Sequence, residues 1–156
     1  PYIGGEESKV EQEPHKLLGR LNEGEIEFAD FPISATATRV PVQNGHLLSV
    51  TVQLQNEPDE IGSLKKVLGG WESPISGLNL PTAPDFPLHL HEDPRYPQPR
   101  LHADSKGGMQ TAIGRVRKSG VMSISYVAMA HNTVRGAAGG AILNAELLVS
   151  KGYLGS

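Results

Sequence analysis

Prolines concentrate in one segment, and this limits where regular secondary structure can form. Seven of the twelve prolines lie within residues 73–100. Proline has no amide hydrogen and a fixed φ angle, so it interrupts helices and the hydrogen-bond ladder of a sheet. We therefore expect this segment to be irregular and extended. A structureless stretch of that length is unusual in a compact domain and indicates a role such as contact with a partner subunit.

Helices are expected on both sides of the proline-rich segment. Three segments have the pattern of helices: residues 6–18, 58–68 and 134–151. In the first, Pro14 is a local irregularity. The third is rich in Ala and Gly, with Asn132 or Thr133 as its N-cap and Gly152 as the stop after its last turn.

Strands are expected in pairs. Five segments have the composition of strands: residues 25–28, 34–42, 46–54, 110–118 and 121–129. Turns at Asn44-Gly45 and Ser119-Gly120 predict two hairpin-like pairs. The predicted fold class is therefore α+β, with a largely antiparallel or mixed sheet that helices cover on one face.

Composition excludes several classes of protein. Apolar runs are far shorter than the roughly 20 residues that span a bilayer, and a net charge of −3 argues against nucleic acid as a partner. The chain has no cysteine, so it has no disulfide and no thiol nucleophile of its own. We expect a cytoplasmic protein. Because the sequence begins without Met in a loop-like stretch, we also expect a fragment of a longer chain.

Arg39 and His46 lie on either side of the predicted Asn44-Gly45 turn. In one straight strand their odd spacing would put them on opposite faces, whereas the turn puts them on neighbouring strands. Arg binds a carboxylate through two parallel hydrogen bonds, and His transfers protons near neutral pH. The alternative is an ordinary surface Arg and a turn His.

Other polar residues lie at predicted helix starts. Glu6 and Lys9 are three residues apart on one helix face, where Lys9 could hold an anion near the helix amino terminus. The alternative is a solvated helix face. Asn132 and Thr133 are candidates for polar contacts to a cofactor, or they simply cap the last helix.

No metal site is predicted. His89 and His91 fall on the same face of a strand, and Glu92 follows them. However, no third ligand lies at a characteristic spacing, and a structural strand edge is the better interpretation.

Several motifs in order resemble one enzyme family. They are ATATRVPVQNGH, LNLPTAP, DPRYPQPRL, GGMQTAIGRVRK and HNTVRGAAGGAILNAELLVSKGYL. Together they resemble the carboxy-terminal catalytic and dimerisation domain of the fungal and archaeal type of aspartate-semialdehyde dehydrogenase. The resemblance covers nearly the whole chain, so we expect residues 1–156 to form that domain. One departure is Leu101-His102-Ala103, where that type would have a more charged segment.

The resemblance implies a fold, a reaction, and a cofactor-binding domain and nucleophile that are not in this chain. It implies a domain like the carboxy-terminal domain of glyceraldehyde-3-phosphate dehydrogenase, assembled as a homodimer or tetramer. The implied reaction is the NADP-dependent interconversion of 4-aspartyl phosphate and aspartate 4-semialdehyde, with phosphate as co-substrate, in the biosynthesis of lysine, threonine and methionine. The family binds NADP mainly through another domain, and its nucleophile is a Cys; neither is present here. This chain alone is expected to fold and to be inactive.

The resemblance also implies a role for each candidate residue. His46 is the acid–base residue, Arg39 binds the substrate α-carboxylate, and Glu6 meets the substrate amino group. Lys9 helps to bind phosphate. Asn132 and Thr133 contact the nicotinamide end of NADP.

Two other functions are alternatives for this sequence. One is a malonyl-CoA reductase of the same superfamily, which reduces a thioester and binds no substrate amino group; Glu6 and Lys9 favour the amino-acid substrate instead. The other is a non-catalytic oligomerisation module, against which the combined presence of Glu6, Lys9, Arg39 and His46 argues.

Overall fold

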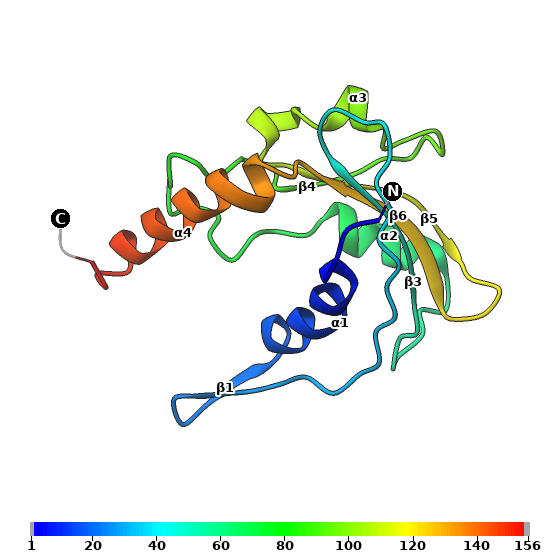
Figure 1. Cartoon of the computed structure of the whole chain (residues 1–156), viewed down its shortest axis with the longest axis horizontal. Coiled ribbons are helices and arrows are strands. Elements are labelled where there is room, and N and C mark those ends of the chain that lie inside the picture. Colours follow the sequence, from blue (N-terminus) through cyan, green and yellow to red (C-terminus); the bar gives the residue numbers. More distant parts are fainter. Residues whose placement is uncertain (1, 155–156) are drawn as a thin grey trace. The chain divides into compact units, whose positions relative to one another are not determined.

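The computed structural model describes residues 2–154 and divides into two compact units, Pro1–Pro41 and Val42–Ser156. Figure 1 shows the elements in chain order. Both units contain helices and strands, and the predicted α+β class is confirmed. Within the described residues, no helix combines the length and apolar character needed to cross a membrane.

The first unit combines one helix with a small hairpin. Helix α1 spans Glu6–Leu17, which confirms the predicted helix, with Pro14 inside it. Strand β2, Glu25–Glu27, is also as predicted, and it pairs antiparallel with a strand that was not predicted, β1, Arg20–Asn22. The turn residues Glu23 and Gly24 have φ angles of 50° and 89°, which is the left-handed geometry of a tight hairpin turn.

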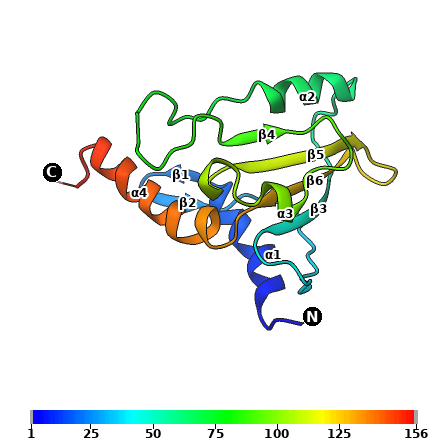
Figure 2. The same cartoon turned by 90° about the horizontal axis from the view of Figure 1, so that it is seen from above.

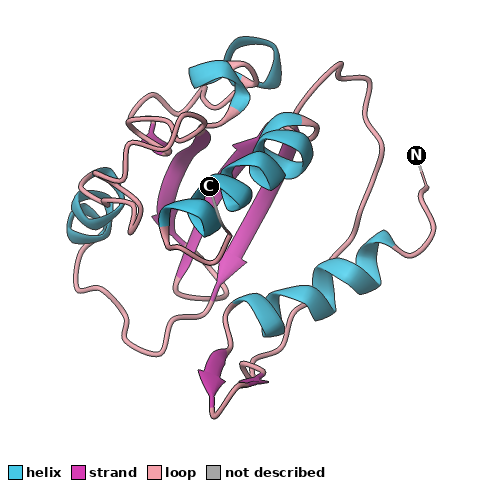
Figure 3. Ribbon diagram, turned by 90° about the vertical axis from the view of Figure 1, so that its left-hand side faces the viewer, coloured by secondary structure: helices cyan, strands magenta, loops and turns pink. Residues whose placement is uncertain are grey.

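The prediction of a strand over residues 34–42 is wrong. This segment follows the hairpin as loop in Figure 3, and two of its backbone amides donate to side chains of α1 rather than to another strand. Glu11 Oε1 accepts the N–H of Ala35, and Glu7 Oε1 accepts the N–H of Ala37, both at 2.9 Å. Glu7 and Glu11 are four residues apart and therefore share one helix face. The two carboxylates thus accept backbone N–H groups that would otherwise donate to the carbonyl oxygens of a neighbouring strand.

The second unit is built on a four-stranded mixed sheet in the order β3-β6-β5-β4 (Figure 2). Its strands are β3, His46–Val52; β4, Leu88–Leu90; β5, Thr111–Lys118; and β6, Ile124–Ala130. The predicted hairpin of β5 and β6 is confirmed, with a register shift between Gly114 and Arg117. The predicted hairpin across Asn44-Gly45 is wrong, because β3 pairs antiparallel with β6 instead.

The proline-rich segment is largely irregular, as predicted, but it contains β4, which pairs parallel to β5. Helix α2, Ile61–Gly69, confirms the second predicted helix, although it begins later than expected. Two short helical elements follow β4. They are the α-helix α3, Pro99–His102, and the 3-10 helix η1, Ser105–Gly108.

The carboxy-terminal helix begins with a π-helical turn. This turn, η2, spans Val134–Ala138 and leads into α4, Gly139–Ser150, which extends beyond the end of β6 in Figure 1. The stop at Gly152 is confirmed: its φ is 75°, its N–H donates to Val149 O, and the N–H of Tyr153 donates to Leu148 O. Leu143 of α4 packs with Leu80 and Met109 to form the buried core.

Candidate functional site

The six predicted site residues fall on both units, three on each. Glu6, Lys9 and Arg39 belong to the first unit. His46, Asn132 and Thr133 belong to the second.

In the first unit, the charged side chains are accessible. Glu6 is the first residue of α1 and is half-buried, whereas Lys9, three residues on, is exposed. Gly5 precedes the helix with a φ of 76° and offers no side chain to cap it. Arg39 is exposed and lies just after the segment bound by Glu7 and Glu11. Because residues 34–42 form no strand, the predicted placement of Arg39 on a strand beside His46 is wrong.

In the second unit, His46 is the first residue of β3. It pairs with Ala130 of β6, and its side chain is exposed. The preceding residue, Gly45, is buried and has a φ of 101°, a conformation that favours glycine. Its N–H donates to Asn132 Oδ1 at 3.0 Å. The structure therefore links Asn132 to the residue that immediately precedes His46, although the two lie far apart in the sequence.

A histidine caps the turn before α4, and the sequence interpretation missed it. Thr133 occupies the N-cap position as predicted, but its side chain makes no capping hydrogen bond. Instead, His131 Nδ1 accepts the N–H groups of Thr133 and Val134, both at 3.1 Å. The ring proton must then lie on Nε2, which is 3.5 Å from Asp104 Oδ1. His131 is 5% exposed, so this cap is buried.

A second group of histidines lies beside β4. The ring centroid of His91 is 4.4 Å from that of His89 and 4.5 Å from that of His102, and Tyr96 packs against both His91 and His102. Burial lowers the pKa of His91, electrostatic repulsion from His89 and His102 lowers it further, and attraction to Asp93 raises it. Within residues 2–154, no three ligating side chains are placed to hold a metal ion. The packed imidazoles instead disfavour protonation of His91.

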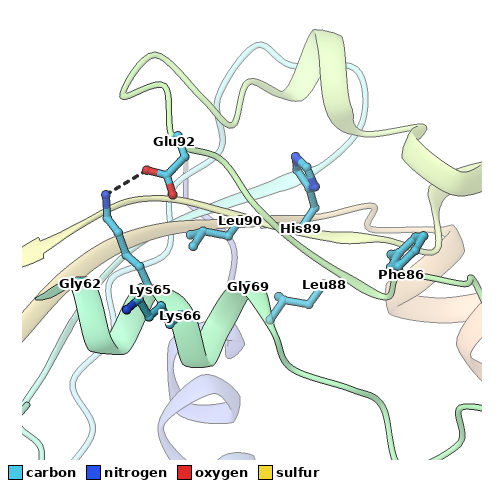
Figure 4. A pocket seen from close by; sticks show the side chains of 9 residues that line it. All are labelled: Gly62, Lys65, Lys66, Gly69, Phe86, Leu88, His89, Leu90 and Glu92. Carbon is cyan, nitrogen blue, oxygen red and sulfur yellow. Dashed lines mark hydrogen bonds and ion pairs between the residues drawn. The ribbon is translucent and has the colours of Figure 1, made fainter.

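A shallow pocket of about 640 Å³ lies between α2 and β4, and none of the six predicted residues lines it. Figure 4 shows Lys65 of α2 reaching Glu92, and the two side chains form an ion pair at 3.2 Å. The lining also includes Phe86, Leu88 and Leu90. The lining is apolar for the larger part, although Lys66 and His89 also belong to it.

Comparison with known proteins places this α+β domain in a class of dehydrogenase subunit domains. The family model for the dimerisation domain of semialdehyde dehydrogenases matches residues 1–135. The chain belongs to this family.

Several relatives share one enzyme name. An aspartate-semialdehyde dehydrogenase of Archaeoglobus fulgidus is 46% identical over 97% of this chain and 43% of its own length. One of Trichophyton rubrum is 38% identical over 99% of this chain and 44% of its own length. The chain thus spans less than half the length of these curated relatives.

A solved structure confirms the fold. The crystal structure of aspartate semialdehyde dehydrogenase with NADP from Candida albicans superposes with a TM-score of 0.88 at 36% identity. The similarity covers 99% of this chain and 45% of that one. A domain of this fold therefore occurs as part of a larger dehydrogenase chain.

Proposed function

We propose that this chain is the carboxy-terminal catalytic and dimerisation part of an aspartate-semialdehyde dehydrogenase. The observation that carries the proposal is the match to enzymes of that name, at 46% and 38% identity, over 97% and 99% of the chain. The whole enzyme would interconvert 4-aspartyl phosphate and aspartate 4-semialdehyde, with NADP and phosphate, in aspartate-family amino-acid biosynthesis. We place this enzyme in the cytoplasm.

The first unit supplies charged groups that suit the substrate. Arg39 presents two parallel donors to the α-carboxylate, and Glu6 presents an acceptor to the amino group. Lys9 contributes a positive charge for phosphate. Among the described residues, the ion pairs involve none of these three side chains, which supports their use by ligands.

The second unit supplies the acid–base residue. The exposed imidazole of His46 can accept the proton of an attacking thiol and, in the next step, the proton of the hemithioacetal hydroxyl. Because this chain has no cysteine, a thiolate must come from elsewhere in the whole enzyme, and the isolated chain is expected to be inactive.

Residues at the start of the last helix fit contacts to the nicotinamide end of NADP. Asn132 is half-buried and Thr133 is exposed, and both lie where β6 leads into η2. When bound, NADP supplies the acceptor for hydride. Asn132 and Thr133 would orient its carboxamide, since both side chains carry hydrogen-bonding groups.

We further propose that the sheet of the second unit forms a homodimer. Leu48 and Val50 of the edge strand β3 lie opposite Ala128 and Tyr126 of β6, so all four side chains share one face. Leu48 is 45% exposed, and the other three are half-buried. An apolar sheet face of this kind suits a partner subunit, in keeping with the dimerisation family to which the chain belongs.

A choice of substrates tests the proposal. The full-length protein that contains this chain would be assayed with aspartate 4-semialdehyde, NADP and phosphate, and separately with malonyl-CoA and NADPH. We expect turnover of the semialdehyde only, and none by the isolated chain. Turnover of malonyl-CoA alone would assign the chain to a thioester reductase. A stable oligomer without either activity would make it an oligomerisation module.

A further inference from the structure

The turn that precedes His46 is held by a side chain rather than by the sheet. The pairing of β3 with β6 begins at His46 and Ala130. One residue earlier, the Gly45 N–H points to Asn132 Oδ1 at 3.0 Å. Asn132 therefore extends the hydrogen bonding by one step beyond the last paired residues. Without that acceptor, the amide of a buried residue would lack a partner, which proteins generally avoid.

Packing around Gly45 adds a second restraint. A Cβ atom on Gly45 would lie 3.6 Å from the Cβ atoms of Pro99 and Ala103, so α3 and the residue after it lie close to this turn. Ala103 itself is 5% exposed. With a φ of 101°, Gly45 sets the direction in which the chain enters β3. The position of the His46 imidazole thus depends on how firmly the Gly45 peptide is held.

Asn132 is itself fixed by its neighbour. His131 is buried, and its Nδ1 accepts the next two backbone N–H groups, from Thr133 and Val134. Its carbonyl oxygen also accepts the N–H of Gly136 at 2.9 Å. A Cβ atom on Gly108 would lie 3.2 Å from the His131 ring, so the ring has little room to move. The backbone on both sides of Asn132 is therefore constrained.

We propose that Asn132 is a positioning residue for His46, acting through the Gly45 amide, and that His131 holds Asn132 in place. The inference rests on the proposed function for the role of His46. The oxygen of the Asn132 amide is committed to Gly45, which leaves its NH2 group as a donor for the cofactor carboxamide. One side chain would then align the acid–base residue with the nicotinamide. Placement matters because a shift of about 1 Å can cost about 100-fold in rate.

Two substitutions distinguish the acceptor role of the Asn132 side-chain oxygen from the donor role of its NH2 group. Asn132→Asp keeps the acceptor oxygen and removes the donor, whereas Asn132→Ala removes both. In the full-length protein, we expect Asn132→Ala to lower kcat about tenfold or more, within the range that misplacement produces. Asn132→Asp should recover most of that kcat loss while its KM for NADP rises as in Asn132→Ala. Asn56→Ala, at an exposed loop position, is the matched control and should change neither constant.

Hydrogen exchange provides a readout that requires no turnover. We expect the Gly45 and His46 amides to exchange faster in Asn132→Ala than in the wild type, and at the wild-type rate in Asn132→Asp. Equal exchange in all three proteins would overturn the proposal, as would a kcat equally low in both variants. If the wild type does not turn over aspartate 4-semialdehyde, the proposed function is wrong. The exchange rates still decide whether Asn132 fixes the residues at the start of β3.

Discussion

Glu11 binds the backbone of Ala35 across the first unit, with 2.9 Å between its Oε1 and the amide nitrogen. Glu7, one turn earlier on α1, binds Ala37 in the same way. The helix thereby fixes the extended segment that leads to Arg39. Carboxylates of α1 therefore set the path of the chain toward a predicted substrate-binding residue.

Removing the Glu11 acceptor should loosen this segment. We expect Glu11→Ala to lower the free energy of unfolding by about 1–3 kcal/mol, the usual cost of leaving a partly buried amide unpaired. Glu11→Gln should cost less, because its amide oxygen can still accept. Urea denaturation of the chain measures both. The exposed Glu13 supplies the control, Glu13→Ala, and an equal effect at both positions would refute the role of Glu11.

Gly114 should tolerate no side chain. A Cβ atom there would collide with the carbonyl oxygen of Tyr96, which is backbone and cannot move aside easily. We expect Gly114→Ala to lower the free energy of unfolding by about 1–3 kcal/mol, as overpacking does. Gly120→Ala, which meets nothing within 4 Å, is the matched control in thermal denaturation. Equal melting temperatures for the two variants would contradict the close approach at β5.

Stability should fall in mild acid because of His91. Its pKa is lowered in the folded chain by burial first and then by His89 and His102. Below about pH 6.5, the unfolded chain therefore binds a proton at His91 that the folded chain binds less well. The free energy of unfolding consequently decreases as the pH is lowered. Asp93 stays charged in this range because its hydrogen bonds with Arg95 lower its pKa to about 2.

The test of this pH dependence is a pair of urea titrations between about pH 5 and 8, for the wild type and His91→Gln. The substitution should flatten the decline, since Gln does not titrate. Identical slopes in the two proteins would show that His91 has no part in it. The exposed His46, changed to Gln, is the control for loss of a histidine in general.

The dimer face should be sensitive to charge. We expect Leu48→Glu to convert the chain from dimer to monomer in sedimentation or light scattering, because it places a carboxylate in an apolar interface. Ser49→Glu changes the neighbouring, exposed residue on the opposite face of β3 and should leave the dimer intact. A wild type that is strictly monomeric at all concentrations would contradict the proposed dimer.

Elements with strong local signals could be predicted from the sequence. The charged pattern of α1, the Ser119-Gly120 turn between β5 and β6, and Gly152 after α4 each determine structure within a few residues. The partner of β3 could not be predicted in this way. It lies in β6, more than seventy residues further along the chain, and only tertiary packing selects it over the nearby residues 34–42.

The candidate site was predictable in residue type but not in its connections. Arg39 and His46 stand out because Arg and His have distinctive chemistry. His131 did not, since capping preferences favour short polar side chains and give no weight to an imidazole that reaches back to its own turn. The bond from Gly45 to Asn132 joins residues 87 positions apart, a separation at which sequence pattern carries no signal.

NADP reduction by the full-length protein, with aspartate 4-semialdehyde and with or without phosphate, tests the central claim most directly. The wild type would be compared with His46→Asn. We predict phosphate-dependent turnover by the wild type. The rate of the variant should be lower by a factor of about 100 or more, as expected for loss of a general acid–base residue. A wild type that does not oxidise the semialdehyde, or a variant that is equally fast, would contradict the account.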